Sequence, residues 1–386
     1  MTSHLRNKFF WFRTVLLICT LVVTASCAPS PTATPVPVPT KAAPAATAVP
    51  APTQAPAPAA TAVPATAVPA PTTAPTTALA PTQAAAPLFV LKAGHNSTDQ
   101  YPHGRVITYF AQEVGKRTNG RVKVEVFANA TLGDEAKMFE GLRLGTIDMA
   151  KAITSVPANT IPEFGVFDLP YLFKDKKQQF DILNGPVGQN LLKKLETVGV
   201  KGLFWMDQGT RNIYTSKKAV RSLADLKGLK IRAIQSPIMI DTINALGASA
   251  TPMAFGELYV GLQQGVVDGA ENSPDSVYAN KHYEVAKYFT QSEHFRTPVL
   301  FMMSMQTWNK LPKDIQDAID ASSKAAFEWG NDLYEKEANQ NLDDLKGKGM
   351  EIIKVDLDPF RAAVESVYQK NSAKVGADLI KQIRGK

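Results

Sequence analysis

The sequence predicts an α/β protein whose folded part forms two lobes. Strand-like and helix-like segments alternate between residues 89 and 150, and a second alternation of the same kind occupies residues 209–296. Residues 299–303 are then typical of a buried strand, and a helical pattern runs from residue 312 to about 345. The alternation favours parallel strand pairing with right-handed crossovers, and the last two segments indicate a chain that returns to its first lobe.

In the first lobe, strands are expected to begin near residues 89, 122 and 147, where apolar and polar side chains alternate. Helical periodicity covers residues 101–118 and ends at an Asn-Gly pair, a common helix stop. Ligands on parallel sheets bind at the carboxyl ends of strands. This rule places Asn96 and Ser155 near a cleft.

The remaining elements follow from the same patterns. They are, in chain order, a packed loop at 161–173, helices at 177–183 and 187–198, a strand at 203–206, and helices at 237–246 and 255–264. The helical pattern from 312 to about 345 has one apolar face and would be about 50 Å long, enough to brace both lobes. A chain that crosses twice between lobes is typical of a hinged protein.

Residues 1–26 are typical of a secretion signal, in which basic side chains precede an apolar run too short for a permanent membrane span. The run ends in Thr24-Ala25-Ser26-Cys27, which resembles a bacterial lipobox, although Thr24 stands where leucine is preferred. We predict a lipid on Cys27; an ordinary signal cleaved nearby is the alternative. The other cysteine, Cys19, is also in this leader, so the mature domain has no disulfide, cysteine nucleophile or cysteine metal site.

Residues 27–87 are almost entirely Pro, Ala, Thr and Val, a composition that cannot bury a core. As extended polyproline II the segment could reach on the order of 150 Å, and we interpret it as a disordered tether. The net charge of +7 is concentrated at the start of the chain, because four basic residues and no acidic residue precede position 88. The weak, dispersed charge of the folded part argues against nucleic-acid binding.

Known catalytic motifs are absent from the sequence, including the nucleophile elbow, the phosphate loop, the dinucleotide fingerprint and the zinc-protease helix. The mature histidines lack metal-ligand spacing; they are His95, His103, His282 and His294. Neither a metal nor a cofactor is therefore expected. Glu271 is the one acidic residue of interest, because it follows a strand of small residues, and we expect it to orient a neighbouring arginine rather than to act as a base.

Two arginines are the candidates for ligand binding. Arg232 lies in a strand-like alternation at 229–234 beside an apolar face, and Arg211 follows a glycine turn and precedes another strand-like run. An arginine in such a place is costly to desolvate unless it meets an anion, and guanidinium groups bind carboxylates bidentately. The alternative is that each arginine is solvated or forms an internal ion pair.

Short sequence words in fixed order resemble the extracytoplasmic solute receptors of tripartite ATP-independent periplasmic (TRAP) transporters, the dicarboxylate-receptor (DctP) family. The resemblance runs from Leu91 to the C-terminus. Its words are LGD at 132–134, GTR at 209–211, LKGLKIR at 226–232, TPMAFGELY at 251–259 and VDGAEN at 267–272. The resemblance implies a type II-like periplasmic-binding-protein fold, with two α/β lobes joined by crossing strands and a long spanning helix.

The resemblance also implies roles for individual residues. The family's central carboxylate-clamping arginine falls on Arg232 and its second arginine on Arg211. The ligand-touching asparagine falls on Asn272, where the metal-dependent keto-acid branch has tryptophan, so the resemblance implies metal-free binding. Phe255 takes the aromatic position of the cleft, and two further polar positions fall on Asn96 and Gln235; Ser155 and Glu271 complete the predicted ligand-binding set.

We therefore predict a non-enzymatic solute-binding protein that captures a small organic acid in the extracytoplasmic space and delivers it to TRAP membrane permease subunits. A sensory receptor for a signalling kinase and, less favoured, an extracytoplasmic enzyme with Glu271 as base are the alternatives. The predicted organisation is a signal peptide at 1–26, the tether at 27–87, lobe I at 88–208 with about 297–336, and lobe II at 209–296 with about 337–375. The membrane contact is predicted to be the lipid on Cys27.

Overall fold

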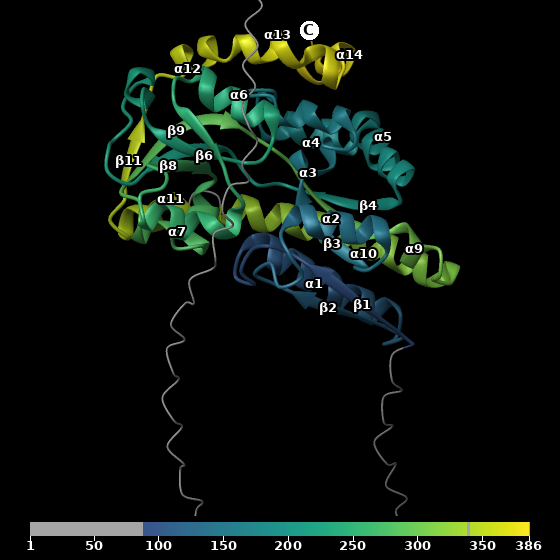
Figure 1. Cartoon of the computed structure of the whole chain (residues 1–386). Helices are drawn as coiled ribbons and strands as arrows, with labels where there is room; N and C mark the ends of the chain where they lie inside the picture. The colour runs from purple at the N-terminus through teal and green to yellow at the C-terminus, as the bar shows by residue number, and fades with distance from the viewer. Residues whose placement is uncertain (1–87, 338–339, 386) are drawn as a thin grey trace, which may run out of the picture. The chain divides into compact units, whose positions relative to one another are not determined.

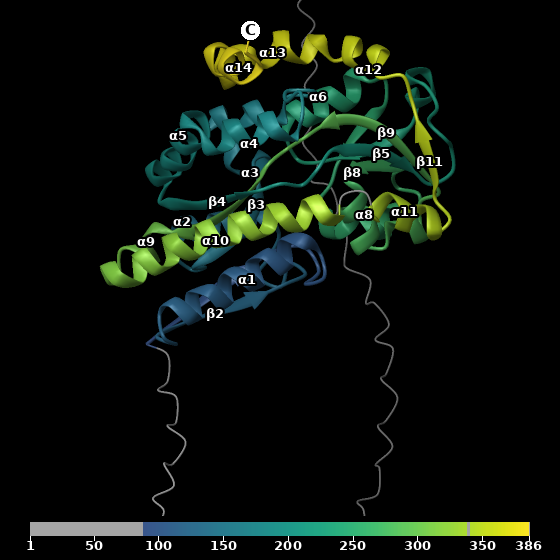
Figure 2. The ribbon, with the colours of Figure 1, turned by 180° about the vertical axis from the view of Figure 1, so that it is seen from behind.

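The computed structural model describes residues 88–337 and 340–385, which form an α/β unit with two sheets (Figures 1 and 2). The predicted signal peptide, tether and lipidated Cys27 lie outside the described residues. The α/β class and its mixture of parallel strands with helices agree with the prediction from strand–helix alternation. Within the described ranges, no helix is both long enough and apolar enough to cross a membrane.

The first sheet has five strands in the order β2-β1-β3-β10-β4. Parallel pairing joins the first three, and β10 runs antiparallel to both β3 and β4. Every residue of β3 and of β10 is buried, as expected for central strands covered on both faces. The strands are β1 (Phe89–Gly94), β2 (Val122–Phe127), β3 (Met149–Ile153), β4 (Val200–Met206) and β10 (Val299–Ser304).

Helices cover both faces of this sheet. On one face, Phe110 of α1 packs between Phe204 and Phe301, whose ring centroids lie 5.7 and 5.3 Å from its own. The long helix α10 packs against α1, as Figure 2 shows. The helices of this part are α1 (Pro102–Arg117), α2 (Glu135–Leu144), α3 (Ser155–Ala158), α4 (Lys176–Asn184), α5 (Pro186–Lys194), α9 (Met305–Trp308) and α10 (Lys313–Glu337), with 3-10 turns η1 (Pro162–Asp168) and η2 (Leu195–Val198).

The second sheet has six strands in the order β11-β9-β5-β8-β6-β7. Here β5 is antiparallel to both of its neighbours, while β8, β6 and β7 run parallel. The strands are β5 (Arg211–Thr215), β6 (Lys230–Ala233), β7 (Ser249–Pro252), β8 (Gly269–Asn272), β9 (Tyr288–Phe295) and β11 (Glu351–Lys354).

Short helices surround the second sheet. The C-terminal pair α13 and α14 packs on η1, and α13 also packs on α6, in the layer at the top of Figure 1. The elements are α6 (Pro237–Ala245), α7 (Leu258–Gln263), α8 (Pro274–Ala279), α11 (Gln340–Gly347), α12 (Asp358–Ala363), α13 (Glu365–Val375) and α14 (Ala377–Arg384), with η3 (Leu223–Leu226), η4 (Phe255–Glu257) and η5 (His282–Glu284).

The chain passes between the sheets three times, through short connections from β4 to β5 and from β9 to β10 and through the long segment with α10 and α11 from β10 to β11. The expected helical run over 312–345 is described as α10, up to Glu337, and α11, from Gln340; residues 338–339 between them lie outside the described residues. The 25 residues of α10 alone correspond to about 37 Å. The segment predicted as a packed loop at 161–173 contains η1, whose Phe164 and Phe167 are buried.

Candidate functional site

A cavity of about 300 Å³ lies between groups carried by the two sheets. Most of its lining follows the carboxyl ends of β1 and β3 in the first sheet and of β6, β7 and β8 in the second, the edge at which parallel sheets bind ligands. Its polar and aromatic lining residues include Asn96, Glu135, Lys151, Ser155, Gln208, Arg211, Arg232, Gln235, Phe255 and Asn272.

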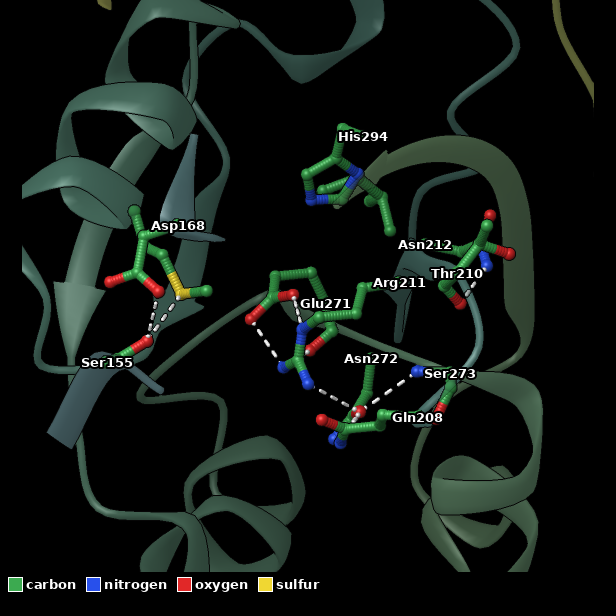
Figure 3. A network of polar contacts seen from close by, with 12 residues as sticks. Ser155, Asp168, Gln208, Thr210, Arg211, Asn212, Glu271, Asn272, Ser273 and His294 are labelled. Atoms are coloured by element: carbon green, nitrogen blue, oxygen red, sulfur yellow. Dashed lines mark hydrogen bonds and ion pairs between the residues drawn. The ribbon is translucent and has the colours of Figure 1, made fainter. Parts of the chain in front are cut away.

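Arg211 begins β5 and is held by a carboxylate of the neighbouring strand (Figure 3). Its Nε donates to Glu271 Oε2 at 2.6 Å, and its Nη2 donates to Glu271 Oε1 at 2.9 Å. Both side chains are essentially inaccessible to solvent. Burial, the largest single effect, would lower the pKa of Arg211, but the charge and the hydrogen bond of Glu271, together with nearby Tyr101 and Tyr214, outweigh it, and the pKa lies above its ordinary value.

Asn272 completes the contacts of Arg211. Its Oδ1 accepts hydrogen bonds from Arg211 Nη1 at 3.0 Å, from Gln208 Nε2 at 3.2 Å and from the backbone N–H of Ser273 at 2.9 Å. Because these donors occupy the oxygen, the side-chain NH₂ of Asn272 is the group that can donate to a ligand. Four of the five N–H groups of Arg211 are used, which leaves one hydrogen on Nη1.

Arg232 differs from Arg211 because no carboxylate lies within ion-pair distance among the described residues. It lies in β6, is only 3% exposed, and donates from Nε to the backbone oxygen of Met253 at 3.0 Å. Its Nη1 is buried and has no hydrogen-bond partner in the described part of the chain. Burial lowers the pKa of Arg232 below its ordinary value. Its Cζ lies 5.9 Å from the ring centre of Phe255, a cation–π distance.

A second charged pair faces the cavity from the five-stranded sheet. Lys151 of β3 donates to Glu135 Oε1 at 2.6 Å and to Asn96 Oδ1 at 2.8 Å. Glu135 is the first residue of α2, and its other oxygen accepts from the backbone N–H of Ile153 at 3.3 Å. The side chains of Lys151 and Glu135 are 5% and 12% exposed, so this is a nearly buried ion pair.

Ser155 lines the cavity, but its hydroxyl is hydrogen-bonded to Asp168, which is not a lining residue. The hydroxyl donates to Asp168 Oδ1 at 2.7 Å, and Ser236 donates to Asp168 Oδ2 at 2.6 Å. Burial raises the pKa of Asp168 to about 6, against the opposing effect of these two hydroxyls. Gln235 also lines the cavity, with an exposed side chain.

The structure places seven of the eight residues predicted as ligand-binding on the cavity wall: Asn96, Ser155, Arg211, Arg232, Gln235, Phe255 and Asn272. Glu271 does not line the cavity. It accepts two hydrogen bonds from Arg211, an arrangement in which it can orient that arginine, as the sequence predicted. Sequence reasoning missed Lys151 and Glu135. The available signal was a lysine in the centre of an otherwise apolar strand, which is costly to bury without a partner.

Comparison with known protein families gives one match to this part of the chain. The model of bacterial extracellular solute-binding protein family 7 (DctP) matches residues 93–374. A solute-binding protein of Verminephrobacter eiseniae is 37% identical over 290 residues, which cover 75% of this chain and 87% of that protein.

Solved structures show the same fold. A TRAP periplasmic solute-binding protein of Pseudomonas putida F1, with bound D-glucuronate, is 34% identical with a TM-score of 0.74, over 77% of this chain and 97% of that one. A TRAP periplasmic solute-binding protein of Sulfurospirillum deleyianum, with bound succinate, is 31% identical with a TM-score of 0.75, over 77% of this chain and 99% of that one. Both bound ligands are carboxylates, but D-glucuronate is a sugar acid and succinate is a dicarboxylate.

Proposed function

Because the chain belongs to bacterial extracellular solute-binding protein family 7, the DctP family of TRAP solute receptors, we propose that it captures an organic acid outside the cytoplasm and delivers it to a membrane permease. The ligand binds in the cavity between the two sheets. The observation that carries this proposal is Arg232, a buried guanidinium whose Nη1 has no partner among the described residues.

In this proposal the ligand carboxylate accepts from Arg232, since guanidinium and carboxylate match bidentately. Arg211 contributes its remaining Nη1 hydrogen, and Asn272 donates from its amide nitrogen. Phe255 covers one side of the carboxylate. Closing of the two lobes excludes water, and these interactions then strengthen because the effective dielectric falls.

The family relationship and the bound carboxylates of the two neighbouring structures support this proposal. We propose no chemical turnover, because the only base that the sequence offered, Glu271, is held by two hydrogen bonds from Arg211. A carboxylate in such a pair is not available to accept a proton from a ligand.

The test is titration calorimetry with carboxylates that a thermal-shift screen identifies as ligands. Arg232→Ala leaves the ligand charge without its partner, which costs about 2–5 kcal/mol, a loss of roughly 30-fold to several-thousand-fold in affinity. The control is Arg143→Ala, which removes a partly exposed side chain that pairs with Glu140 on α2, outside the cavity lining. Near-normal affinity in Arg232→Ala, with the ligand confirmed, contradicts the clamp.

We further propose that a lipid on Cys27 holds the protein at the outer face of the membrane, with residues 27–87 as the tether. The lipobox-like sequence supports this proposal. Fractionation of the producing cells tests it: the full-length chain should sediment with membranes and Cys27→Ser should not. Equal release of both proteins indicates ordinary signal cleavage instead.

A further inference from the structure

The charged groups around the cavity include one buried positive charge without a carboxylate partner in the described structure. Arg211 is paired with Glu271 at 2.6 Å. Lys151 is paired with Glu135, also at 2.6 Å. Arg232 has no such pair, although it is 3% exposed. One ligand carboxylate can therefore be neutralised directly, whereas a second would need another cation, because an unpaired buried charge is unfavourable.

Three cavity residues of the five-stranded sheet region offer both hydrogen-bond donors and acceptors. We call Asn96, Glu135 and Lys151 the Lys151 cluster. The cluster is held by the five-stranded sheet, since Lys151 lies in β3, Asn96 follows β1 and Glu135 begins α2. Lys151 has three N–H groups and uses two of them, while Asn96 retains its NH₂ and Glu135 retains unused lone pairs.

Hydroxyl groups match such a mixed set, because each hydroxyl both donates and accepts. A carboxylate does not match it, since it only accepts and would meet the negative charge of Glu135. The charge of Lys151 is already neutralised by Glu135, so it cannot compensate. Like charges in a nearly buried site repel strongly, because the effective dielectric is low.

We infer that the ligand is a monocarboxylate bearing several hydroxyl groups, a sugar acid, and that Glu135 discriminates against dicarboxylates. This inference rests on the function proposed above. Arg232 binds the single carboxylate, and the Lys151 cluster binds hydroxyls at the other end of the ligand. The cavity volume of about 300 Å³ lies at the small end of the range for ligand pockets, which suits a small acid.

The first experiment measures affinities of the full-length chain by titration calorimetry at pH 7.5. The probes are D-glucuronate, D-galactonate, succinate and hexanoate. We expect at least one sugar acid to bind at least about 30-fold more tightly than succinate or hexanoate. Tighter binding of succinate overturns the inference, and equally tight binding of hexanoate overturns the role of the hydroxyls; both leave the proposed function intact. Failure to bind any carboxylate overturns the proposed function itself.

The second experiment compares Glu135→Gln with the wild type. The amide keeps the shape of the side chain but leaves Lys151 as a second unpaired cation. The ratio of sugar-acid to succinate affinity should therefore shift toward succinate by at least about tenfold. Glu140→Gln is the matched control on the same helix, because Glu140 is exposed and pairs with Arg143 away from the cavity lining; its affinity ratio should equal that of the wild type. An unchanged ratio in Glu135→Gln overturns the assignment of Glu135.

A double variant separates charge from folding. Glu135→Gln with Lys151→Gln adds no lone buried charge to that of Arg232, so it should fold even where the single variant is unstable. It should bind the sugar acid more weakly than the wild type and gain no affinity for succinate. A gain in succinate affinity in the double variant contradicts the charge argument.

Discussion

The two arginines of the cavity should respond in opposite ways when each is replaced by methionine. Arg211 is part of a buried ion pair, whereas Arg232 is a buried cation with no such partner in the described residues. Methionine has a similar length and no charge. Arg211→Met leaves the carboxylate of Glu271 buried and unpaired, and Arg232→Met removes an unpaired charge.

The expected size of the effect follows from the contacts. Breaking a buried pair by removing one partner costs about 3–5 kcal/mol. For a folded part of roughly 300 residues, an unfolding entropy of about 2.1 cal/mol/K per residue converts this cost into a fall in Tm of about 5–8 °C. Arg232→Met loses one hydrogen bond, from Nε to the backbone oxygen of Met253, worth about 1 kcal/mol, and is relieved of an unpaired buried charge. Its Tm should therefore stay within about 2 °C of the wild type or rise.

Differential scanning calorimetry of extensively dialysed, ligand-free protein is the assay. The reasoning is refuted if ligand-free Arg232→Met loses as much stability as Arg211→Met.

The structure supports two further predictions. Burial raises the folded-state pKa of Asp168 to about 6, so its contribution to the stability of the fold is present at low pH and is lost as pH rises from about 4 to 6. The free energy of unfolding of Asp168→Asn, minus that of the wild type, should therefore be more favourable to the variant at pH 7.5 than at pH 4.5, as measured by urea unfolding. Gly269→Ala should lower both Tm and ligand affinity, because the new Cβ would lie 2.4 Å from the backbone oxygen of Tyr214 and displace β8. Gly188→Ala, whose Cβ would meet the backbone oxygen of Leu183, should lower Tm alone; equal losses of ligand affinity in both variants would contradict this separation.

The candidate arginines could be located from sequence because their surroundings are physically unusual. Burying a charged side chain costs free energy unless it is paired, so a charge within an apolar strand pattern marks an unusual position. Arg232 is such a residue and is buried in β6. The carboxyl ends of the predicted strands likewise placed Asn96 and Ser155 at the cavity. These inferences depend on local alternation and on the rule that parallel strands end at a common edge, both of which a single sequence contains.

The pairing of charges could not be predicted in the same way. Glu271 meets Arg211 because β5 and β8 pair antiparallel with Ile213 opposite Glu271, and this register joins segments far apart in the chain. Lys151 and Glu135 meet because the first turn of α2 faces the end of β3. Sequence spacing gives no register, so it could not tell which arginine is neutralised and which remains for a ligand.

Under the function proposed above, that distinction determines how the cavity binds an anion. Glu271 holds Arg211 directly, and its charge also favours the charged form of Arg232, so one carboxylate supports two buried guanidinium groups. The three side chains together carry one excess positive charge. A ligand carboxylate makes the group neutral, whereas a neutral molecule leaves the desolvated Arg232 uncompensated. Closure around a neutral ligand should therefore be unfavourable, and under the proposed function we expect the cavity to select for anions through a charge that the protein itself leaves unbalanced.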